Sequence, residues 1–164
     1  MNNMELLNND IEMALRLLIL INTISTGVDE QLIIFYDYAL LHSSDFDKKQ
    51  ISILPNSPFR KEELSIKVKL IKNALKILAQ KQLIDVIYSE KGIYYLYNKL
   101  TGLFINKLTS IYSKKLIKQA KWVKKHFKNY DEQNIKKYFE KTMSKWDSEF
   151  STYGLFNEGY SYAK

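Results

Sequence analysis

The chain of 164 residues contains no cysteine, only two prolines and only five glycines. Without cysteine it cannot form a disulfide, a thiolate metal site, an iron–sulfur cluster or a cysteine nucleophile, so its stability must come from a packed core. The scarcity of glycine and proline excludes collagen-like and low-complexity chains. With 46% hydrophobic residues, a chain of this length is expected to form about one folded, mainly helical unit.

The sequence also lacks the common nucleotide and metalloprotease motifs. No GxxxxGK[ST], GxGxxG or HExxH pattern is present, and the glycines never cluster into a phosphate-binding loop. Residue types used in catalysis come together only at Asp37, His42, Asp45 and Asp47, where the neighbouring serines favour capping and turns over metal binding. The sequence therefore predicts a protein that is not an enzyme, with no metal, cofactor or small-molecule substrate. A small enzyme built on this cluster is the least favoured alternative.

Long hydrophobic runs are absent as well. The longest, over residues 17–21, is far too short to span a membrane, and the polar, acidic first ten residues do not resemble a signal peptide. We expect a cytoplasmic protein without a membrane partner.

The net charge of +7 is concentrated in the second half of the chain. Residues 1–90 contain 10 basic and 12 acidic residues, whereas residues 91–164 contain 15 basic and 6 acidic ones. A basic half favours polyanions or acidic protein surfaces as partners. Because 23 of the 25 basic residues are lysine, the codon bias of an AT-rich genome accounts for part of this charge.

Two helices are predicted before the prolines. Residues 10–25 are apolar almost all round and belong in a core, with Asp10 as N-cap, Gly27 as C-cap, and Glu12 with Arg16 as an ion pair on the one solvent-facing edge. Residues 29–41 form a second apolar helix. Residues 42–60, which contain both prolines, are predicted to form a long ordered loop.

A third helix and a hairpin complete the first part of the chain. The helix, over residues 61–82, has one apolar and one basic side, and two β-branched and aromatic runs around Gly92 predict the hairpin. Three helices followed by a hairpin is the order of a winged helix, whose third helix can enter a DNA groove. Winged helices also serve as protein-docking modules, so both functions stay open. The candidate DNA-binding residues of this helix are Lys69, Lys72 and Lys76.

A long lysine-rich helix without acidic residues is predicted over residues 99–130. Its apolar stripe changes phase by roughly 130° of helix rotation, so the helix either kinks near Ser113 or packs its second half on a different surface. Its candidate DNA-binding residues are Lys121, Lys124 and Lys125. The apolar residues of the first half are Leu100, Phe104, Leu108 and Ile111, and those of the second half are Leu116, Ala120, Val123 and Phe127.

The last part of the chain, residues 131–164, is predicted to be a short helix capped by Asp131, reaching about Phe150, and an aromatic tail. Such a tail either folds back on the domain or is ordered by a partner, because aromatic side chains anchor protein interfaces. Its candidate partner-binding residues are Trp146, Phe150, Tyr153, Phe156 and Tyr160. The predicted fold class is mainly α with a small β-hairpin, divided into a winged-helix-like domain (1–98), a long basic helix (99–130) and a short helix with its tail (131–164).

Several segments resemble the middle component of bacterial ABC-three-component systems, the group that includes the small subunit of Lamassu-type anti-phage and anti-plasmid defence. They are the run EMALRLLILINTIS, residues 37–45, the entry to the third helix at residues 58–63, and the lysine-rich helix with Trp122. Together they cover roughly residues 5–130. The sequence departs from the family at residues 67–69, where the family tends to have a basic pair, and the tail after Asp131 has no counterpart.

The resemblance implies a non-catalytic adaptor that bridges an SMC-like ABC ATPase and an effector, often a nuclease, and helps hold the effector inactive until foreign DNA is sensed. Double-stranded DNA is a further candidate partner. Within the matching runs, Asp37, His42, Asp45 and Arg60 are candidate structural residues, and we expect Arg60 to pair with Asp37 or Asp45 and hold the long loop in place. The alternative function is a free-standing winged-helix transcription regulator, which would dimerise to read two half-sites.

Overall fold

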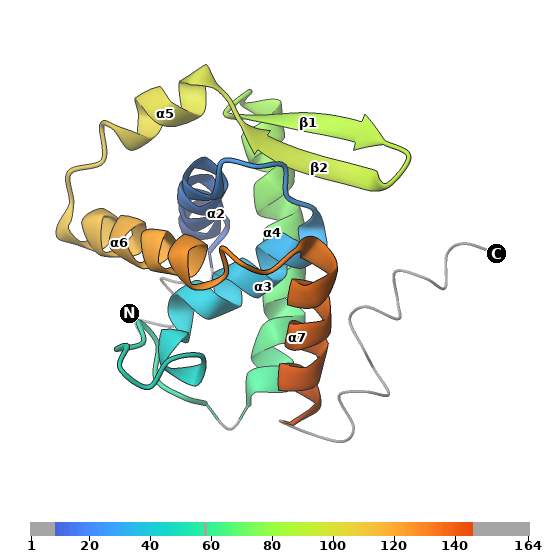
Figure 1. The fold of residues 1–164 in the computed structure, drawn as a ribbon. Coiled ribbons are helices and arrows are strands. Elements are labelled where there is room, and N and C mark those ends of the chain that lie inside the picture. The colour runs from blue at the N-terminus through green and yellow to red at the C-terminus, as the bar shows by residue number, and fades with distance from the viewer. Residues whose placement is uncertain (1–8, 58, 146–164) are drawn as a thin grey trace.

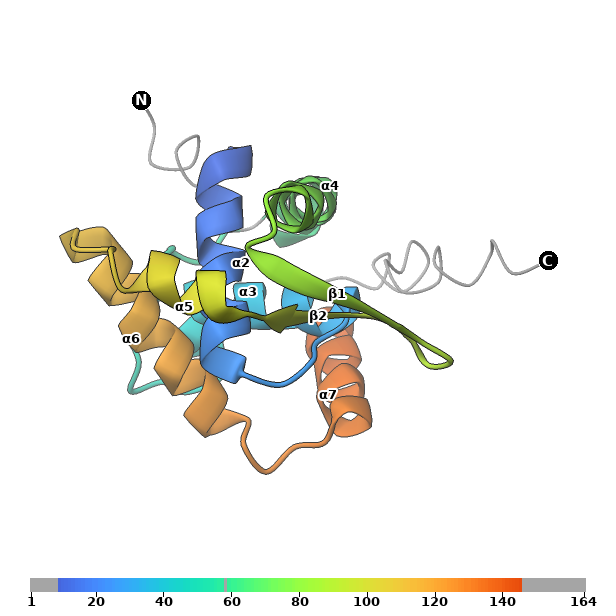
Figure 2. The ribbon, with the colours of Figure 1, turned by 90° about the horizontal axis from the view of Figure 1, so that it is seen from above.

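Helix α2 (Asp10–Ile24) lies at the centre of the protein, with the other helices and the hairpin arranged around it (Figures 1 and 2). The structure is a computed structural model that describes residues 9–57 and 59–145. Within these residues the fold is mainly helical, with six α-helices, a short 3₁₀ helix and one two-stranded antiparallel sheet. The predicted place of α2 in the core is confirmed, because nearly all of its apolar side chains are buried.

The two ends of α2 differ from the prediction. Asn9 is the N-cap in place of Asp10, and its side chain accepts a hydrogen bond of 2.7 Å from the backbone N–H of Glu12. Both residue types can cap, and Asp10 lies instead in the first turn, where its charge complements the helix dipole. At the other end Ser25, not Gly27, is the C-cap: it takes the left-handed conformation with φ 60°, and its N–H still bonds to the carbonyl of Ile21.

Helix α3 (Glu30–Leu41) begins at its N-cap Asp29 and is followed by the 3₁₀ helix η1 (Ser43–Asp45). The loop that follows is fixed near its middle, where the N–H of Leu54 donates to the carbonyl of Leu41 at 3.0 Å. Helix α4 (Arg60–Gln80) then packs along α2. The predicted exposed side of α4 is confirmed, since Lys69, Lys72 and Lys76 are exposed and the apolar side faces the core.

The predicted hairpin is confirmed as β1 (Ile84–Ser89) and β2 (Gly92–Tyr97). The strands pair antiparallel from Ile84 opposite Tyr97 to Ser89 opposite Gly92, whose φ of +132° suits glycine at the turn. Residue Val28, between α2 and α3, adds a single antiparallel bridge to Tyr95 on the other side of β2. This isolated bridge ties the segment between α2 and α3 to the free edge of β2.

The predicted long helix over residues 99–130 is wrong. The chain forms α5 (Lys99–Ile105) and α6 (Ile111–His126), separated by residues 106–110. Ser110 starts α6 as an N-cap, because its hydroxyl accepts the N–H of Ser113 at 3.0 Å. The phase change in the apolar stripe thus marks two helices instead of one kinked helix.

Of the two apolar stripes predicted to be buried in this region, the structure buries the second and exposes most of the first. The second stripe is confirmed, since Leu116, Ala120, Val123 and Phe127 are all buried. The first is wrong for three of its four residues: Leu100, Phe104 and Ile111 are exposed, and only Leu108 packs partly against the core, whereas Thr101 and Ile105 are buried. The reason is a tertiary hydrogen bond, since the Thr101 hydroxyl donates to the carbonyl of Leu83 at 2.5 Å and turns that side of α5 inward.

Helix α7 (Glu132–Ser144) follows its predicted N-cap Asp131, which accepts the N–H of Asn134 at 2.8 Å. The predicted continuation to Phe150 lies outside the described residues. α7 packs on α3 through an aromatic cluster in which the ring centroids of Phe35 and Phe139 lie 4.9 Å apart. All these helices contribute to one hydrophobic core, and the predicted three-part division of the chain stays a prediction. In the described residues no helix is long and apolar enough to cross a membrane.

Candidate functional site

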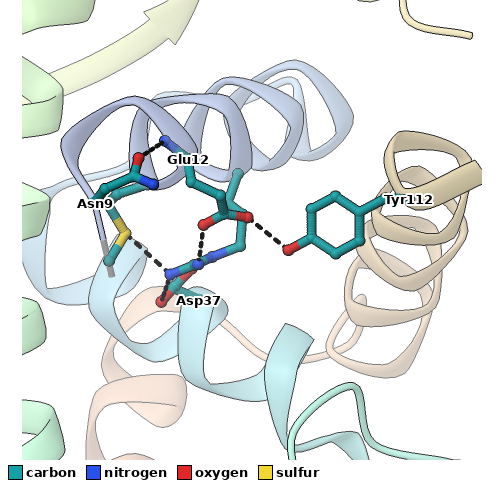
Figure 3. A network of polar contacts seen from close by, with 6 residues as sticks. Asn9, Glu12, Asp37 and Tyr112 are labelled. Carbon is teal, nitrogen blue, oxygen red and sulfur yellow. Dashed lines mark hydrogen bonds and ion pairs between the residues drawn. The ribbon is translucent and has the colours of Figure 1, made fainter. Parts of the chain in front are cut away.

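A buried ionic cluster connects α2 with α3 (Figure 3). The Arg16 guanidinium is fully buried and forms a fork with the carboxylate of Asp37, through Nε to Oδ1 at 2.8 Å and Nη2 to Oδ2 at 3.1 Å. Nη1 also donates to Glu12, one turn earlier in α2. The predicted solvent-facing edge of α2 is therefore wrong. A carboxylate from the next helix compensates the charge and allows the edge to be buried.

The same cluster reaches α6 through Tyr112. The Tyr112 hydroxyl donates to Oε1 of Glu12 at 2.5 Å, and Figure 3 shows the ring extending from α6 toward this carboxylate. Burial raises the pKa of Glu12, while the charge of Arg16 opposes that rise. Burial alone lowers the pKa of Arg16, but the charge of Asp37 and its hydrogen bonds raise it above its usual range, so Arg16 stays charged.

Lys67 of α4 lies close to this cluster and is 5% exposed. Burial lowers the pKa of its ammonium group, and the charge of Asp37 opposes that shift. Burying a lysine costs free energy unless nearby carboxylates offset its charge. Here the carboxylates of Asp37 and Glu12 provide that offset.

A second polar group holds the long loop against α3 and α4. Nη2 of Arg60 lies 3.2 Å from Oδ1 of Asp45, with both side chains mostly buried. The Tyr38 hydroxyl donates to the other carboxylate oxygen of Asp45. Of the two partners expected for Arg60, the structure places Asp45 beside it, while Asp37 is held by Arg16.

His42 completes this second group at the end of α3. Its ring stacks on that of Tyr38 with a centroid distance of 4.6 Å. Nδ1 of His42 is buried without a hydrogen-bond partner among the described residues. Burial, with the charges of Lys67 and Arg60, lowers the pKa of His42 to about 3, so the ring is neutral at physiological pH. Across the described residues, no group of three or more histidine, aspartate or glutamate side chains is arranged to hold a metal ion.

The two predicted groups of DNA-binding lysines are exposed but lie apart. Lys69, Lys72 and Lys76 are on α4, where Nζ of Lys72 lies 3.6 Å from the Glu30 carboxylate. Lys121, Lys124 and Lys125 are on α6, where Nζ of Lys124 donates to the Ser25 hydroxyl at 2.9 Å. Figure 2 shows α4 and α6 on opposite sides of α2, so the structure does not bring the two groups into one surface.

An exposed apolar surface, not expected from the sequence, lies on the hairpin and α5. Its large hydrophobic side chains are between 42% and 78% exposed. The i, i+3, i+4 spacing of Leu100, Leu103 and Phe104 was the available signal, and it is also the spacing of a core-facing helix. We call this the hairpin–α5 surface, formed by Tyr88, Ile93 and Tyr97, which the strand register places on one face of the hairpin, and by Leu100, Leu103 and Phe104 of α5.

The predicted partner-binding residues Trp146, Phe150, Tyr153, Phe156 and Tyr160 lie outside the described residues, so their role stays a prediction.

Comparison with known proteins identifies a family. The family model described as ABC-three component (ABC-3C) system Middle Component 2 matches residues 6–149, a stretch that includes every described residue. Neither a curated protein nor a solved structure matches the chain. The resemblance to a middle component is confirmed at the level of this family, and the chain belongs to the Middle Component 2 family of ABC-three-component systems.

Proposed function

We propose that this chain is a non-catalytic adaptor subunit that joins the ATPase and the effector of its ABC-three-component system. Family membership supports a place among the other components of such a system. The hairpin–α5 surface carries the proposal, because exposed large apolar side chains gathered on adjacent elements mark a protein interaction site. Its aromatic residues are of the kind that anchor interfaces.

Within this proposal the first part of the chain is a winged helix. The order of α2, α3, α4 and the β1–β2 hairpin supports it. A winged helix carries a short strand between its first two helices, and Val28 occupies that position. Its backbone exchanges two hydrogen bonds with Tyr95, at 3.0 and 2.8 Å. In this fold the hairpin–α5 surface comprises the wing and the helix that follows it.

The partners in this proposal are an SMC-like ABC ATPase and a nuclease effector of a Lamassu-type defence system. The resemblance of residues 37–45 and of the α2 run to the small subunit of such systems supports this choice. The adaptor would bridge the two partners and hold the effector inactive until foreign DNA is sensed.

The test is affinity purification of the tagged full chain from its native host, with mass spectrometry of the proteins recovered. The wild type is expected to recover a coiled-coil ABC ATPase and a nuclease-like protein. The variant Leu103→Asp/Phe104→Asp should lose at least one of them, because a charge on the hairpin–α5 surface opposes apolar docking. The control is Ile51→Asp, which places one such negative charge on an apolar side chain that is 86% exposed in the loop. Full recovery of both partners by Leu103→Asp/Phe104→Asp would overturn the role of this surface.

The alternative, a free-standing winged-helix regulator, draws on the exposed lysines of α4. Such a protein reads two half-sites as a dimer. Recovery of the chain alone, as a dimer that retards one defined DNA fragment, would overturn the adaptor proposal in favour of this regulator.

A further inference from the structure

Helix α6 presents a straight basic row to solvent. Lys114, Lys118, Lys121 and Lys125 follow one another at spacings of four, three and four residues, and all four are exposed. At 100° and 1.5 Å per residue they fall within about 60° of helix rotation and extend over about 16 Å. We call these four residues the α6 row.

The α6 row lies on a firmly held helix. The opposite side of α6 is buried through Leu116, Ala120 and Val123. Two polar contacts add to this packing: Tyr112 to Glu12 at 2.5 Å, and Nε2 of Gln119 to the Ser43 hydroxyl at 2.5 Å. The four ammonium groups therefore extend from a fixed backbone, with only their own side chains free to adjust.

No acidic side chain interrupts the row along the sequence. All 18 acidic residues of the chain lie outside residues 99–130. Among the described residues, the ion pairs involve no member of the α6 row. The codon bias of an AT-rich genome raises the number of lysines but does not remove aspartate or glutamate. It therefore does not explain why residues 99–130 contain basic and no acidic residues. Uncompensated charge of this kind attracts polyanions.

Helix α4 occupies the position of the helix that enters the DNA groove in a winged helix, but it is less suited than α6 to bind a polyanion. Glu62 and Glu63 lie in its first turn, Lys67 is buried, and Lys72 has Glu30 nearby at 3.6 Å. These acidic groups oppose a phosphate backbone. The charge distribution thus favours α6 over α4 as the element that meets DNA.

We propose that the α6 row docks the phosphodiester backbone of double-stranded DNA. Lysine ammonium groups bind phosphates as point charges, and the row lacks the planar groups of arginine, asparagine and glutamine that form two bonds to one base, so binding depends little on sequence. A protein partner is less favoured, because lysine is depleted from the centres of protein interfaces. Single-stranded DNA is less favoured, because Trp122 and His126 of α6 stack on each other with a centroid distance of 4.8 Å instead of offering free rings to bases.

This inference deepens the adaptor proposal but is tested on the isolated full chain, so that each can fail alone. Fluorescence anisotropy with labelled duplexes of unrelated sequence, over a series of salt concentrations, measures Kd and its salt slope. The wild type should bind all duplexes alike, with a slope of log Kd on log salt near 3.6 for about four phosphates neutralised. Replacing the four lysines of the α6 row by glutamine should weaken binding at least tenfold and lower this slope.

The matched control removes the same charge from α4 and its end, by replacing Lys69, Lys72, Lys76 and Lys81, all of them exposed, with glutamine. It should weaken binding less than threefold. An equal or larger loss in this control would overturn the proposal and assign DNA binding to α4. Wild-type Kd values above 1 mM for duplex at low salt, or equal affinity for poly-glutamate and for DNA, would overturn it as well.

Two measurements separate a binding defect from a folding defect. The melting temperature of the glutamine variant of the α6 row should stay close to that of the wild type, because its side chains are exposed. Replacing the same four lysines by arginine keeps the charge and should preserve DNA binding. The glutamine variant should still recover the ATPase and the effector in the affinity purification, since it leaves the hairpin–α5 surface intact.

Discussion

The hydroxyl of Tyr112 in α6 donates a 2.5 Å hydrogen bond to the Glu12 carboxylate in α2, across 100 positions of the sequence. The other oxygen of that carboxylate accepts from Arg16, whose guanidinium also holds Asp37 of α3. Through Glu12 and Arg16, α2 is thus connected to both α6 and α3. The helix that carries the α6 row is held to the core by this relay as well as by its apolar side.

Removing the hydroxyl in Tyr112→Phe should lower the free energy of unfolding by about 1.5–3 kcal/mol, since the bond is to a charged group. Urea denaturation measures the change, and amide hydrogen exchange in α6 should become faster. Tyr88→Phe is the control, because Tyr88 is 78% exposed on β1 and should change stability by less than 0.5 kcal/mol or so. Equal stability of Tyr112→Phe and the wild type would contradict the relay.

Breaking the central pair in Asp37→Asn should cost about 3–5 kcal/mol, because it leaves the fully buried Arg16 without its opposite charge. Replacing both partners, in Arg16→Met/Asp37→Leu, should cost less than Asp37→Asn alone, since no buried charge is left uncompensated. Chemical denaturation of Arg16→Met, of Asp37→Leu and of the double variant completes the comparison. Losses that simply add would show that the two side chains do not stabilise each other.

His42 predicts a loss of stability in acid. In the unfolded chain histidine takes up a proton near pH 6.5, whereas burial and the charges of Lys67 and Arg60 lower the pKa of His42 to about 3. Between these values the unfolded state binds the extra proton, so this group lowers the free energy of unfolding by up to about 1.4 kcal/mol for each unit that the pH falls.

The variant His42→Phe should remove this contribution while keeping a ring against Tyr38. Urea denaturation at pH 7.5 and pH 5.0 should show a smaller acid loss for the variant than for the wild type. His42→Asn provides a second variant in case phenylalanine disturbs the packing. The same acid loss in all three proteins would show that His42 takes up its proton in the folded state as readily as in the unfolded one.

Breaking the ion pair between Arg60 and Asp45 should lower the free energy of unfolding less than breaking the pair between Arg16 and Asp37. The side chain of Arg60 is 19% exposed and that of Asp45 13%, so Arg60→Ala should cost about 1 kcal/mol and lower the melting temperature by a few degrees. Lys72→Ala is the control, because its pair with Glu30 is 3.6 Å long and exposed, and its removal should leave the melting temperature nearly unchanged. An unchanged melting temperature for Arg60→Ala would contradict a role in holding the loop.

Local signals in the sequence predict much of the fold correctly. The apolar α2, the two-sided α4, the hairpin around Gly92 and the Asp131 cap all depend on neighbouring residues, and all are present in the structure. The buried stripe of α6 is also correct, since a helix with one apolar side buries that side. Each of these features is decided within one or two turns of chain.

The candidate site could be predicted only in part. The candidate DNA-binding lysines of α4 and α6 are exposed as expected, because long charged side chains stay in water unless a partner compensates them. The two groups lie on opposite sides of α2 because of how the helices pack. The spacing of residues within one helix carries no information about that packing. The hairpin–α5 surface was missed for the same reason, since its leucines have the spacing of a core-facing stripe.

By itself the sequence determined most of the helices, the hairpin, the cap at Asp131 and which half of the chain is basic. Only the tertiary structure decided that Arg16 is buried, because the carboxylate that compensates it comes from Asp37, 21 positions away. It likewise decided which side of α5 faces inward, through the bond from Thr101 to Leu83, 18 positions away. Periodicity describes the preference of one segment, whereas burial of a charge or exposure of an apolar side chain depends on the groups that other segments bring to it.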